Sequence, residues 1–179
     1  MRLRNIPGAN EAVASSPYCI QNPSEHRGQW HAFLQSASPI HVEIGMGKGR
    51  FLMDLAEQNP DIQYIGIERY TSVLLRAVQK MDELQLPNVH FICEDAAKLP
   101  EVFAQAEVDR IYLNFSDPWP KDRHAKRRLT SRQFLERYDQ FLAPDGRIEF
   151  KTDNQDLFTF SVEEIEESPI WNLDASTRD

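Results

Sequence analysis

The sequence predicts an α/β fold in which a mostly parallel central sheet is covered by helices on both faces. Five short apolar runs alternate with segments that have helical periodicity or turn residues, the pattern of a parallel sheet buried on both faces. A glycine-rich turn lies directly between the first apolar run and the first helical segment. With 179 residues, of which 41% are apolar and 27% charged, the chain has the size and composition of one globular domain.

The five apolar runs are the expected strands. They are Ile40–Ile44, Gln63–Glu68, Val89–Cys93, Arg110–Phe115 and Arg147–Lys151. Residues 144–146, Pro-Asp-Gly, are typical turn residues and are expected to form the turn into the fifth strand. Residues 171–173 are expected to begin a sixth strand.

Four segments have the apolar spacing of amphipathic helices. The first ends at Asn59, because a residue that precedes a proline disfavours helical geometry. The second and third begin at hydroxyl residues that can act as N-caps, and the fourth covers residues 155–167. The expected caps are Thr71 or Ser72 for the second helix and Thr130 or Ser131 for the third, whose buried stripe extends from Phe134 to Leu142.

The N-terminal part is expected to differ from the rest of the chain. Residues 1–35 are predicted to form an irregular or partly helical extension, and residues 36–179 the folded domain. Arg2 and Arg4 form either a basic arm over a substrate or a frayed terminus. No apolar h-region follows Met1 and no run approaches 18 apolar residues, so we expect a cytoplasmic protein that is neither secreted nor membrane-spanning.

Cysteine and histidine positions argue against a metal or disulfide framework. Cys19 and Cys93 are the only cysteines and lie far apart, which excludes a disulfide framework and a thiolate zinc site. The five histidines share no ligand spacing, so no metal is expected.

The net charge of −8 hides a basic segment. Residues 153–179 hold eight acidic residues and one basic residue, and so carry seven of the eight net negative charges. Residues 121–132 hold six basic residues and one acidic residue. This uneven distribution favours a polyanion-binding segment within an acidic protein, with a solvated charged face as the alternative.

The glycine-rich turn is the first candidate ligand site. Gly45, Gly47 and Gly49 allow the backbone to turn sharply and to bring bare amides close to a ligand at a helix N-terminus. Position 50 is arginine, so the turn lacks the third glycine of the dinucleotide-binding pattern. Glu43, just before the turn, would repel a pyrophosphate and favours a cationic or zwitterionic ligand. The alternative is a glycine turn that binds nothing.

Acidic residues end or follow four of the expected strands, at the sheet edge where such folds bind ligands. Glu68 can bind the two hydroxyls of a ribose, or it is a solvated strand-end charge. Asp95, with Ala96, can bind an adenine amino group, or Asp95 is a helix N-cap. Together with Glu43 and Asp117 these carboxylates favour a positively charged adenosyl ligand, S-adenosylmethionine, over NAD.

Residues 114–121, Asn-Phe-Ser-Asp-Pro-Trp-Pro-Lys, form the most specific motif. Two prolines stiffen the backbone around Trp119, fix Asp117 and Lys121, and leave an indole face on which a base can stack. The alternative is that Trp119 fills the core and Asp117 is a turn residue. The basic run at 123–128 can hold a phosphate backbone while this loop holds the base. Asp153, after the fifth strand, is a further carboxylate at this edge or a helix cap.

The chain resembles the bacterial tRNA (guanine-N7-)-methyltransferases over nearly its whole length. The glycine motif is shared by many methyltransferases, whereas the pairing of Ser-Asp-Pro-Trp-Pro-Lys with Arg-His-x-Lys-Arg-Arg is far narrower. The matching segments are Arg2–Asn5, residues 43–49, Ile65–Glu68, Leu113–Lys121, Arg123–Thr130 and Phe150–Asp153.

The resemblance implies a Rossmann-like class I methyltransferase fold. It also implies transfer of a methyl group from S-adenosylmethionine to N7 of a guanosine in the tRNA variable loop, with S-adenosylhomocysteine as the product. The expected partner is tRNA, bound by a monomer or homodimer. The motif and the resemblance together nominate Glu43, Gly45, Gly47, Gly49, Glu68, Asp95, Ala96 and Asp117 for the cofactor, and Lys121, Asp153, Arg123, His124, Lys126, Arg127 and Arg128 for the substrate.

Asp117 is the candidate catalytic residue, and we expect it to position the guanine or the methyl group instead of acting as an obligatory base. The family has a further segment with a Thr-x-Tyr-Glu motif and the last strands of the sheet, which are expected to be missing because the chain stops at Asp179. Two rival functions remain open. One is methylation of an adenine amino group, against which Trp119 counts, and the other is a non-catalytic module that binds tRNA or the cofactor.

Overall fold

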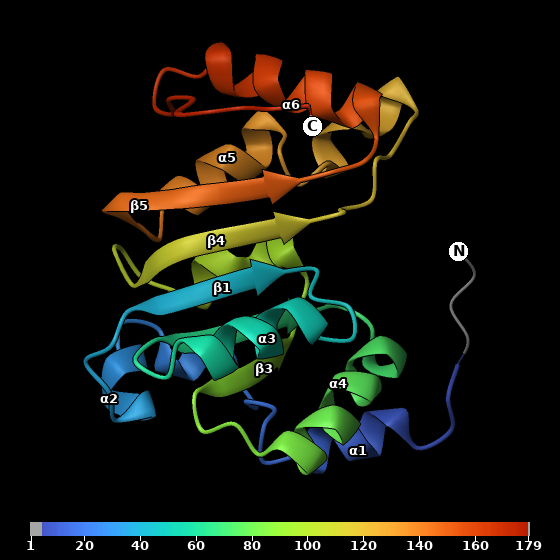
Figure 1. The fold of residues 1–179 in the computed structure, drawn as a ribbon, viewed down its shortest axis with the longest axis vertical. Coiled ribbons are helices and arrows are strands. Elements are labelled where there is room, and N and C mark those ends of the chain that lie inside the picture. The colour runs from blue at the N-terminus through green and yellow to red at the C-terminus, as the bar shows by residue number, and fades with distance from the viewer. Residues whose placement is uncertain (1–4, 179) are drawn as a thin grey trace.

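The computed structural model describes residues 5–178. Its five strands form one sheet in the order β3-β2-β1-β4-β5, and every neighbouring pair is parallel (Figure 1). The strands are β1 (Ile40–Ile44), β2 (Gln63–Glu68), β3 (Val89–Cys93), β4 (Val108–Asn114) and β5 (Leu142–Lys151). The prediction of a parallel α/β sheet is confirmed.

Helices cover both faces of this sheet. In Figure 1, α3 crosses in front of the strands, and α5 lies behind β5. The α-helices are α1 (Ala9–Ser15), α2 (Trp30–Leu34), α3 (Arg50–Gln58), α4 (Thr71–Leu84), α5 (Arg132–Asp139) and α6 (Gln155–Glu166). Three short 3₁₀ helices are η1 (Pro23–His26), η2 (Ala96–Glu101) and η3 (Asp122–Arg127).

Two apolar cores, one on each face, hold the layers together. Side chains alternate along each strand, so Ile65 and Ile67 of β2 pack into one core and Tyr64 into the other. The first core includes residues of η2 and α5, and the second includes residues of α1, α3 and α4. The central strands are therefore buried on both sides, as their continuous apolar sequence predicts.

Residues 5–35 pack onto this domain. Trp30 is fully buried, and its indole N–H donates to the carbonyl oxygen of Val102 at 2.8 Å. The amide of Phe91 in β3 donates to the carbonyl of Tyr18, so residues 18–20 lie along the sheet edge. The extension is partly helical, as predicted. Its Trp30 belongs to the apolar core of the domain. Arg2 and Arg4 lie outside the described residues.

Helix boundaries differ from the prediction where tertiary contacts intervene. The N-cap of α4 is Tyr70, which makes no side-chain cap bond, and the hydroxyl of Thr71 instead donates to Asn10, 61 positions away. The predicted cap at Thr71 or Ser72 is therefore wrong. Ser131 caps α5 as predicted, by accepting from the amide of Phe134 at 3.3 Å. The helix ends at Asp139, so Phe141 and Leu142 do not belong to it.

The last predicted strands are also corrected. β5 begins at Leu142, which pairs with Val108, and the ladder resumes when Arg147 pairs with Arg110. Residues 143–146 therefore form a bulge inside β5 instead of a turn before it. Residues 171–173 form no strand, because the indole of Trp171 donates to the carbonyl of Leu135 and packs against α5 instead.

The order of the strands places the site. The chain runs from β1 outward to β3 and then returns to the other side of β1 with β4, so the switch point lies between β1 and β4. Open α/β sheets bind ligands at the carboxyl ends of the strands beside such a switch point. Within residues 5–178, no helix is both long and apolar enough to cross a bilayer.

Candidate functional site

Glu43 lies near the carboxyl end of β1, beside the switch point, and is the most buried of the candidate carboxylates. Its side chain is 2% exposed, and its Oε2 accepts a hydrogen bond of 3.0 Å from Asn114 Nδ2 across the β1–β4 boundary. Its Oε1 is buried and accepts no hydrogen bond from the described residues. Burial raises the pKa of Glu43 to about 7, against the lowering effect of Asn114 and with a smaller rise from Glu68.

The glycine-rich turn after β1 has a left-handed backbone, with φ of 74° at Gly45, 58° at Gly47 and 81° at Gly49. Four of its amides, however, are not bare. The amides of residues 45 and 46 donate to the carbonyl of Ile67, that of Gly47 to Glu68, and that of Gly49 to the carbonyl of Met46. The turn is therefore anchored to β2 and does not direct these N–H groups at a phosphate.

A second glycine, Gly66 in β2, explains how closely the turn lies against the sheet. A Cβ at position 66 would overlap the side chain of Met46. By contrast, a Cβ at Gly45 or Gly47 would meet no atom within 4 Å. The turn therefore packs tightly on its sheet side and leaves open space on its outer side.

Glu68 joins the turn to the start of α4. Its Oε1 accepts from the amide of Gly47 and its Oε2 from the amide of Tyr70, both at 3.1 Å. Burial raises the pKa of Glu68, these amides lower it, and the nearby charge of Asp117 raises it slightly. Glu43, Glu68 and Asp117 thus interact electrostatically from three different strand ends. Glu68 is a buried, hydrogen-bonded carboxylate, which excludes the solvated alternative.

Asp95 begins η2. Its Oδ1 accepts from the amide of Ala97 at 2.9 Å, so the N-cap role weighed from the sequence is present. Ala96 is the first residue of this 3₁₀ helix and is half-buried beside it. Both residues lie beyond β3, on the far side of β2 from the switch point.

The loop after β4 carries Asp117 and has a strained backbone. Phe115 has φ of 54° and Trp119 has φ of 45°, values that non-glycine residues rarely adopt and that cost about 1–3 kcal/mol each. The amide of Phe115 donates to the carbonyl of Lys151 at 2.8 Å, which ties the start of the loop to the end of β5. Asp117 is exposed. Such strain clusters at functional sites.

Arg128 holds the middle of this loop. Its Nε donates to the carbonyl oxygens of Pro118 and Trp119 at 3.1 Å, and its Nη2 donates to Trp119 at 2.8 Å. Its guanidinium lies 4.5 Å from the ring centroid of Phe160 in α6. The sequence motif predicts Arg128 as an RNA contact, but its Nε and Nη2 already donate to the protein.

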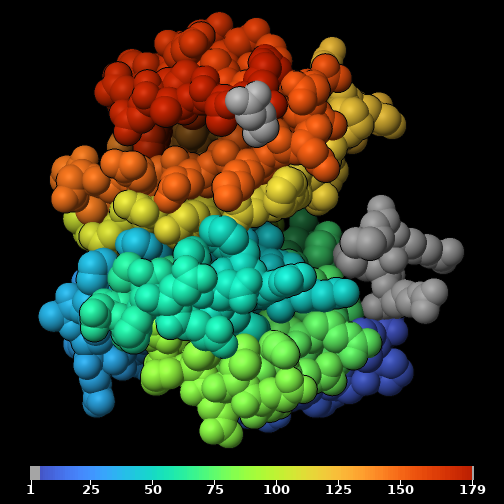
Figure 2. Space-filling model, in the orientation of Figure 1, coloured from blue at the N-terminus to red at the C-terminus, as the bar shows by residue number. Residues whose placement is uncertain are grey.

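The other basic residues of the run behave differently. Lys121, Arg123, Lys126 and Arg127 are exposed, and η3 presents them at the end of the sheet, where residues 115–128 project at the upper right of Figure 2. His124 is half-buried and makes a T-shaped contact with Trp119, at 5.7 Å between ring centroids. The run therefore contains both outward cations and residues that support the loop.

Asp153 follows β5 and is exposed. It does not cap α6, because that N-cap is Asn154, which accepts from the amide of Leu157 at 2.8 Å. Asn114 and Phe115 were not singled out from the sequence. Their only signal was membership in the motif at 114–121, since the bond to Glu43 joins residues 71 positions apart.

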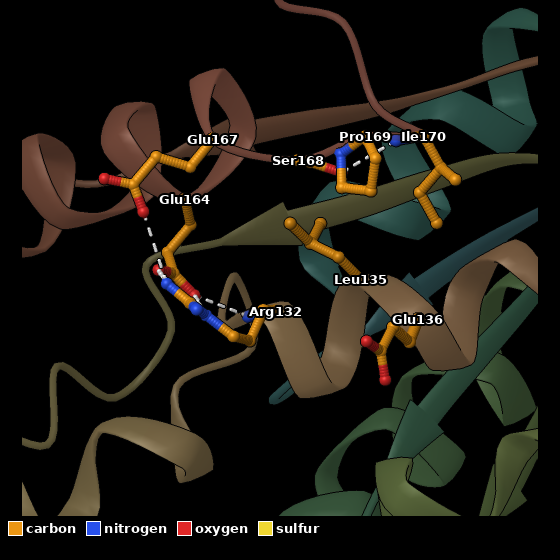
Figure 3. A pocket seen from close by; sticks show the side chains of 8 residues that line it. All are labelled: Arg132, Leu135, Glu136, Glu164, Glu167, Ser168, Pro169 and Ile170. Atoms are coloured by element: carbon orange, nitrogen blue, oxygen red, sulfur yellow. Dashed lines mark hydrogen bonds and ion pairs between the residues drawn. The ribbon is translucent and has the colours of Figure 1, made fainter.

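Cavities elsewhere do not coincide with this carboxylate cluster. The larger, of about 300 Å³, lies between α5, α6 and residues 168–170, beside the ion pairs of Arg132 with Glu164 and Glu167 (Figure 3). Because Arg132 is paired with these two glutamates, it is not among the unpaired cations of residues 121–132. Among residues 5–178, no three His, Cys, Asp or Glu side chains are placed to hold a metal ion.

The residues at the sheet edge fit S-adenosylmethionine better than a phosphorylated ligand. Glu43 offers a buried oxygen without a donor, and Asp117 adds a nearby exposed carboxylate. The turn is open on its outer side, and the amides of its three glycines are already bonded within the protein. A cation that brings its own hydrogen-bond donors satisfies this set, whereas Glu43 and Asp117 repel a pyrophosphate.

Comparisons with known proteins agree with this assignment. A family model described as "Putative methyltransferase" matches residues 37–178. A tRNA (guanine-N(7)-)-methyltransferase of Lachnoclostridium phytofermentans is 58% identical over 173 residues, which are 97% of this chain and 80% of that protein. A protein of the same name from Geobacillus sp. is 53% identical over 163 residues, 90% of this chain and 74% of that protein.

Solved structures show the same fold. An antibiotic-related methyltransferase superposes with a TM-score of 0.59 at 22% identity, over 74% of this chain and 67% of that chain. An aminoglycoside resistance methyltransferase superposes with a TM-score of 0.58 at 21% identity, over 82% and 70% of the two chains. The prediction of a Rossmann-like class I methyltransferase fold is confirmed.

Proposed function

The chain belongs to the tRNA (guanine-N7-)-methyltransferase family, and on that premise we propose how its residues divide the work between donor and acceptor. It is an S-adenosylmethionine-dependent enzyme that methylates N7 of a guanosine in tRNA. The carboxylates at the β1–β4 switch point hold the methyl donor, and residues 114–128 present the guanosine, which we place in the variable loop. The observation that carries this division is the cluster of Glu43, Glu68 and Asp117.

The donor-binding residues are assigned by what each side chain offers. When bound, S-adenosylmethionine supplies an electrophilic methyl group on a positively charged sulfur. Glu43 and Asp117 provide negative charge for its cationic end, next to the open side of Gly45 and Gly47. Glu68 retains free lone pairs for the ribose hydroxyls, since each of its oxygens accepts one backbone amide. Asp95 and Ala96, beyond β3, take the adenine end.

The acceptor needs little chemistry from the protein. N7 of guanine carries an in-plane lone pair and no proton, so no residue has to act as a base before attack. The purine becomes positively charged as it is methylated, and fixed carboxylates stabilise this charge without moving. Asp117 therefore positions the reacting groups. Correct alignment of the two substrates supplies about 7–11 kcal/mol of the barrier reduction.

The tRNA is held by the exposed cations of η3 and its flanks. Lys121, Arg123 and Lys126 are free to neutralise phosphates, Arg127 is exposed beside Trp119, and binding weakens as salt increases. Local opening of the tRNA exposes the target base. Asp153, exposed at the end of β5, is a candidate contact for the guanine. We infer a cytoplasmic site of action, since tRNA is the substrate, and a monomer or homodimer as the active form.

Nucleoside analysis tests the proposal directly. The chain is incubated with radiolabelled S-adenosylmethionine and unmodified tRNA, and the tRNA is digested to nucleosides. Label in N7-methylguanosine is the expected result. Label in a methyladenosine would support the adenine rival, and tRNA binding without any label would support a non-catalytic module.

The Asp117→Asn variant tests the role of Asp117. If Asp117 only positions the reacting groups, methyl transfer slows without a change in the shape of its pH–rate profile. A wild-type rate governed by one ionisation that Asp117→Asn removes, while both substrates still bind, would show a base role instead.

A further inference from the structure

Trp119 was expected to stack on a base, but its indole already packs against neighbouring residues of the protein. The guanidinium of Arg127 lies 5.1 Å from the indole centroid, and His124 contacts it in a T-shaped arrangement. The carbonyl of Trp119 is held by Arg128. The side chain is half-buried. A base could use the face under Arg127 only after these contacts are broken.

Phe115 is the aromatic side chain of the same loop that has no such partners among the described residues. It is 65% exposed, the largest exposed fraction of the large apolar side chains in residues 5–178. Its φ of 54° is strained for a non-glycine residue. An exposed phenylalanine in a strained backbone is unfavourable in the free protein, so a bound partner is the natural explanation.

The backbone of Phe115 is fixed at the functional edge of the sheet. It directly follows Asn114, which donates to Glu43, and its own amide donates to Lys151 at the end of β5. It precedes Asp117 by two residues. Phe115 is thus held between the ends of β4 and β5, next to the carboxylate cluster.

The order of the strands decides which purine Phe115 meets. The residues assigned to the adenine end, Asp95 and Ala96, follow β3, which is separated from β4 by β2 and β1. Phe115 follows β4, on the other side of the switch point and next to the basic run that holds RNA. The acceptor base approaches from this side.

We propose that Phe115 is the aromatic platform on which the target guanine stacks, and that Trp119 is a strut that shapes the loop. This inference rests on the proposed function. Stacking on an aromatic side chain tolerates any base, so Phe115 contributes affinity and orientation while neighbouring polar groups select guanine.

Phe115→Ala, Phe115→Leu and Phe115→Tyr test the proposal in the full chain, with Phe33→Ala as the matched control. Phe33 is also exposed, at 44%, but stacks on His26 in the N-terminal part of the chain. KM for tRNA and kcat are measured at saturating S-adenosylmethionine, and affinity for S-adenosylmethionine is measured by calorimetry. Thermal melts verify that each variant is folded.

We expect Phe115→Ala and Phe115→Leu to raise KM for tRNA about tenfold or more, while affinity for S-adenosylmethionine stays within about twofold of wild type. Phe115→Tyr keeps the ring and retains most of the activity, and Phe33→Ala behaves as wild type. An unchanged KM in a folded Phe115→Ala variant overturns the proposal, as does a loss of S-adenosylmethionine affinity equal to the loss of tRNA affinity. A wild-type chain that methylates no tRNA would instead refute the proposed function.

Discussion

The two halves of the site carry opposite charge and differ in burial. Glu43 and Glu68 on β1 and β2 are buried and tied to fixed donors, whereas Lys121, Arg123 and Lys126 near η3 are exposed. Buried carboxylates cost folding free energy, but they face a small cation without reorganisation. Exposed cations cost little and suit a large polyanion whose phosphates can shift. Donor binding should therefore depend on pH, and tRNA binding on salt.

Loss of the Glu68 side chain should have the largest effect. Glu68→Ala leaves the amides of Gly47 and Tyr70 without their acceptors, so we expect about 2–4 kcal/mol lower stability in urea melts. Calorimetry should show S-adenosylmethionine affinity reduced about 100-fold or more, because the variant lacks the carboxylate and no longer anchors the glycine-rich turn. Glu68→Gln, which keeps one acceptor oxygen, serves as the control and should lose less stability. Wild-type donor affinity in Glu68→Ala would contradict the assignment.

Glu43→Gln should remove a pH dependence. The pKa of Glu43 is about 7 in the folded protein and about 4.5 when exposed, so the folded state holds the proton over this interval. Stability therefore falls as pH rises from about 4.5 to 7, by up to about 2–3 kcal/mol. Donor affinity should rise from pH 6 to 8, because binding a cation favours ionised Glu43. Both trends should flatten in Glu43→Gln, with donor affinity at pH 8 reduced about tenfold.

The control for this experiment is Glu94→Gln. Glu94 also lies near the carboxyl edge but is only half-buried. The same pH trends in Glu43→Gln and wild type would show that another group titrates.

Arg128→Ala should separate the structural cation from the exposed ones. Without Arg128 the carbonyls of Pro118 and Trp119 lose their donor, and the loop that carries Asp117 can move. We therefore expect kcat to fall about tenfold. Arg128→Lys should not restore the rate, because an ammonium cannot reproduce the planar set of hydrogen bonds. The salt dependence of tRNA binding should stay unchanged. A reduced salt slope would return Arg128 to the RNA contacts.

Lys126→Ala combined with Arg123→Ala should give the smallest effect on the reaction, since both side chains are exposed and neither contacts Trp119. Each exposed cation that contacts a phosphate contributes about 0.7–0.9 to the slope of log affinity against log salt. We expect the double variant to bind tRNA more weakly, with a shallower salt slope, and to keep its affinity for S-adenosylmethionine. Binding titrations at several salt concentrations measure this. An unchanged slope would make these residues a solvated face.

Local sequence patterns predicted the elements that depend on local geometry. Strand bounds for β1 to β3 were correct, and Gly45, Gly47 and Gly49 adopt the left-handed backbone that only glycine adopts easily. Errors occurred where a distant partner intervened. The hydroxyl of Thr71 donates to Asn10 instead of capping α4, and pairing with β4 turns the predicted turn before β5 into a bulge within it.

In the candidate site, too, the positions of the residues were predictable from local sequence, whereas their contacts were not. The sequence placed Glu43, Glu68 and Asp117 at one sheet edge, because parallel strands end together. It did not show that the amides of the three glycines are already bonded, or that Arg128 holds the loop. Partners of a polar group can be any residues that folding brings within 3 Å or so, and their spacing in the sequence carries no signal.

By itself, the sequence determined the order of the five strands and of the helices α3 to α6, the residue types at the sheet edge and the family. These follow from periodicity, backbone preference and motif, which are properties of neighbouring residues. Tertiary structure decided which side chains are free to meet a ligand. Arg127 packs on the indole of Trp119 and Arg128 binds its carbonyl, while Phe115 stays exposed. Burial raises the pKa of Glu43 to about 7. Burial and hydrogen-bond partners arise only when distant segments pack together.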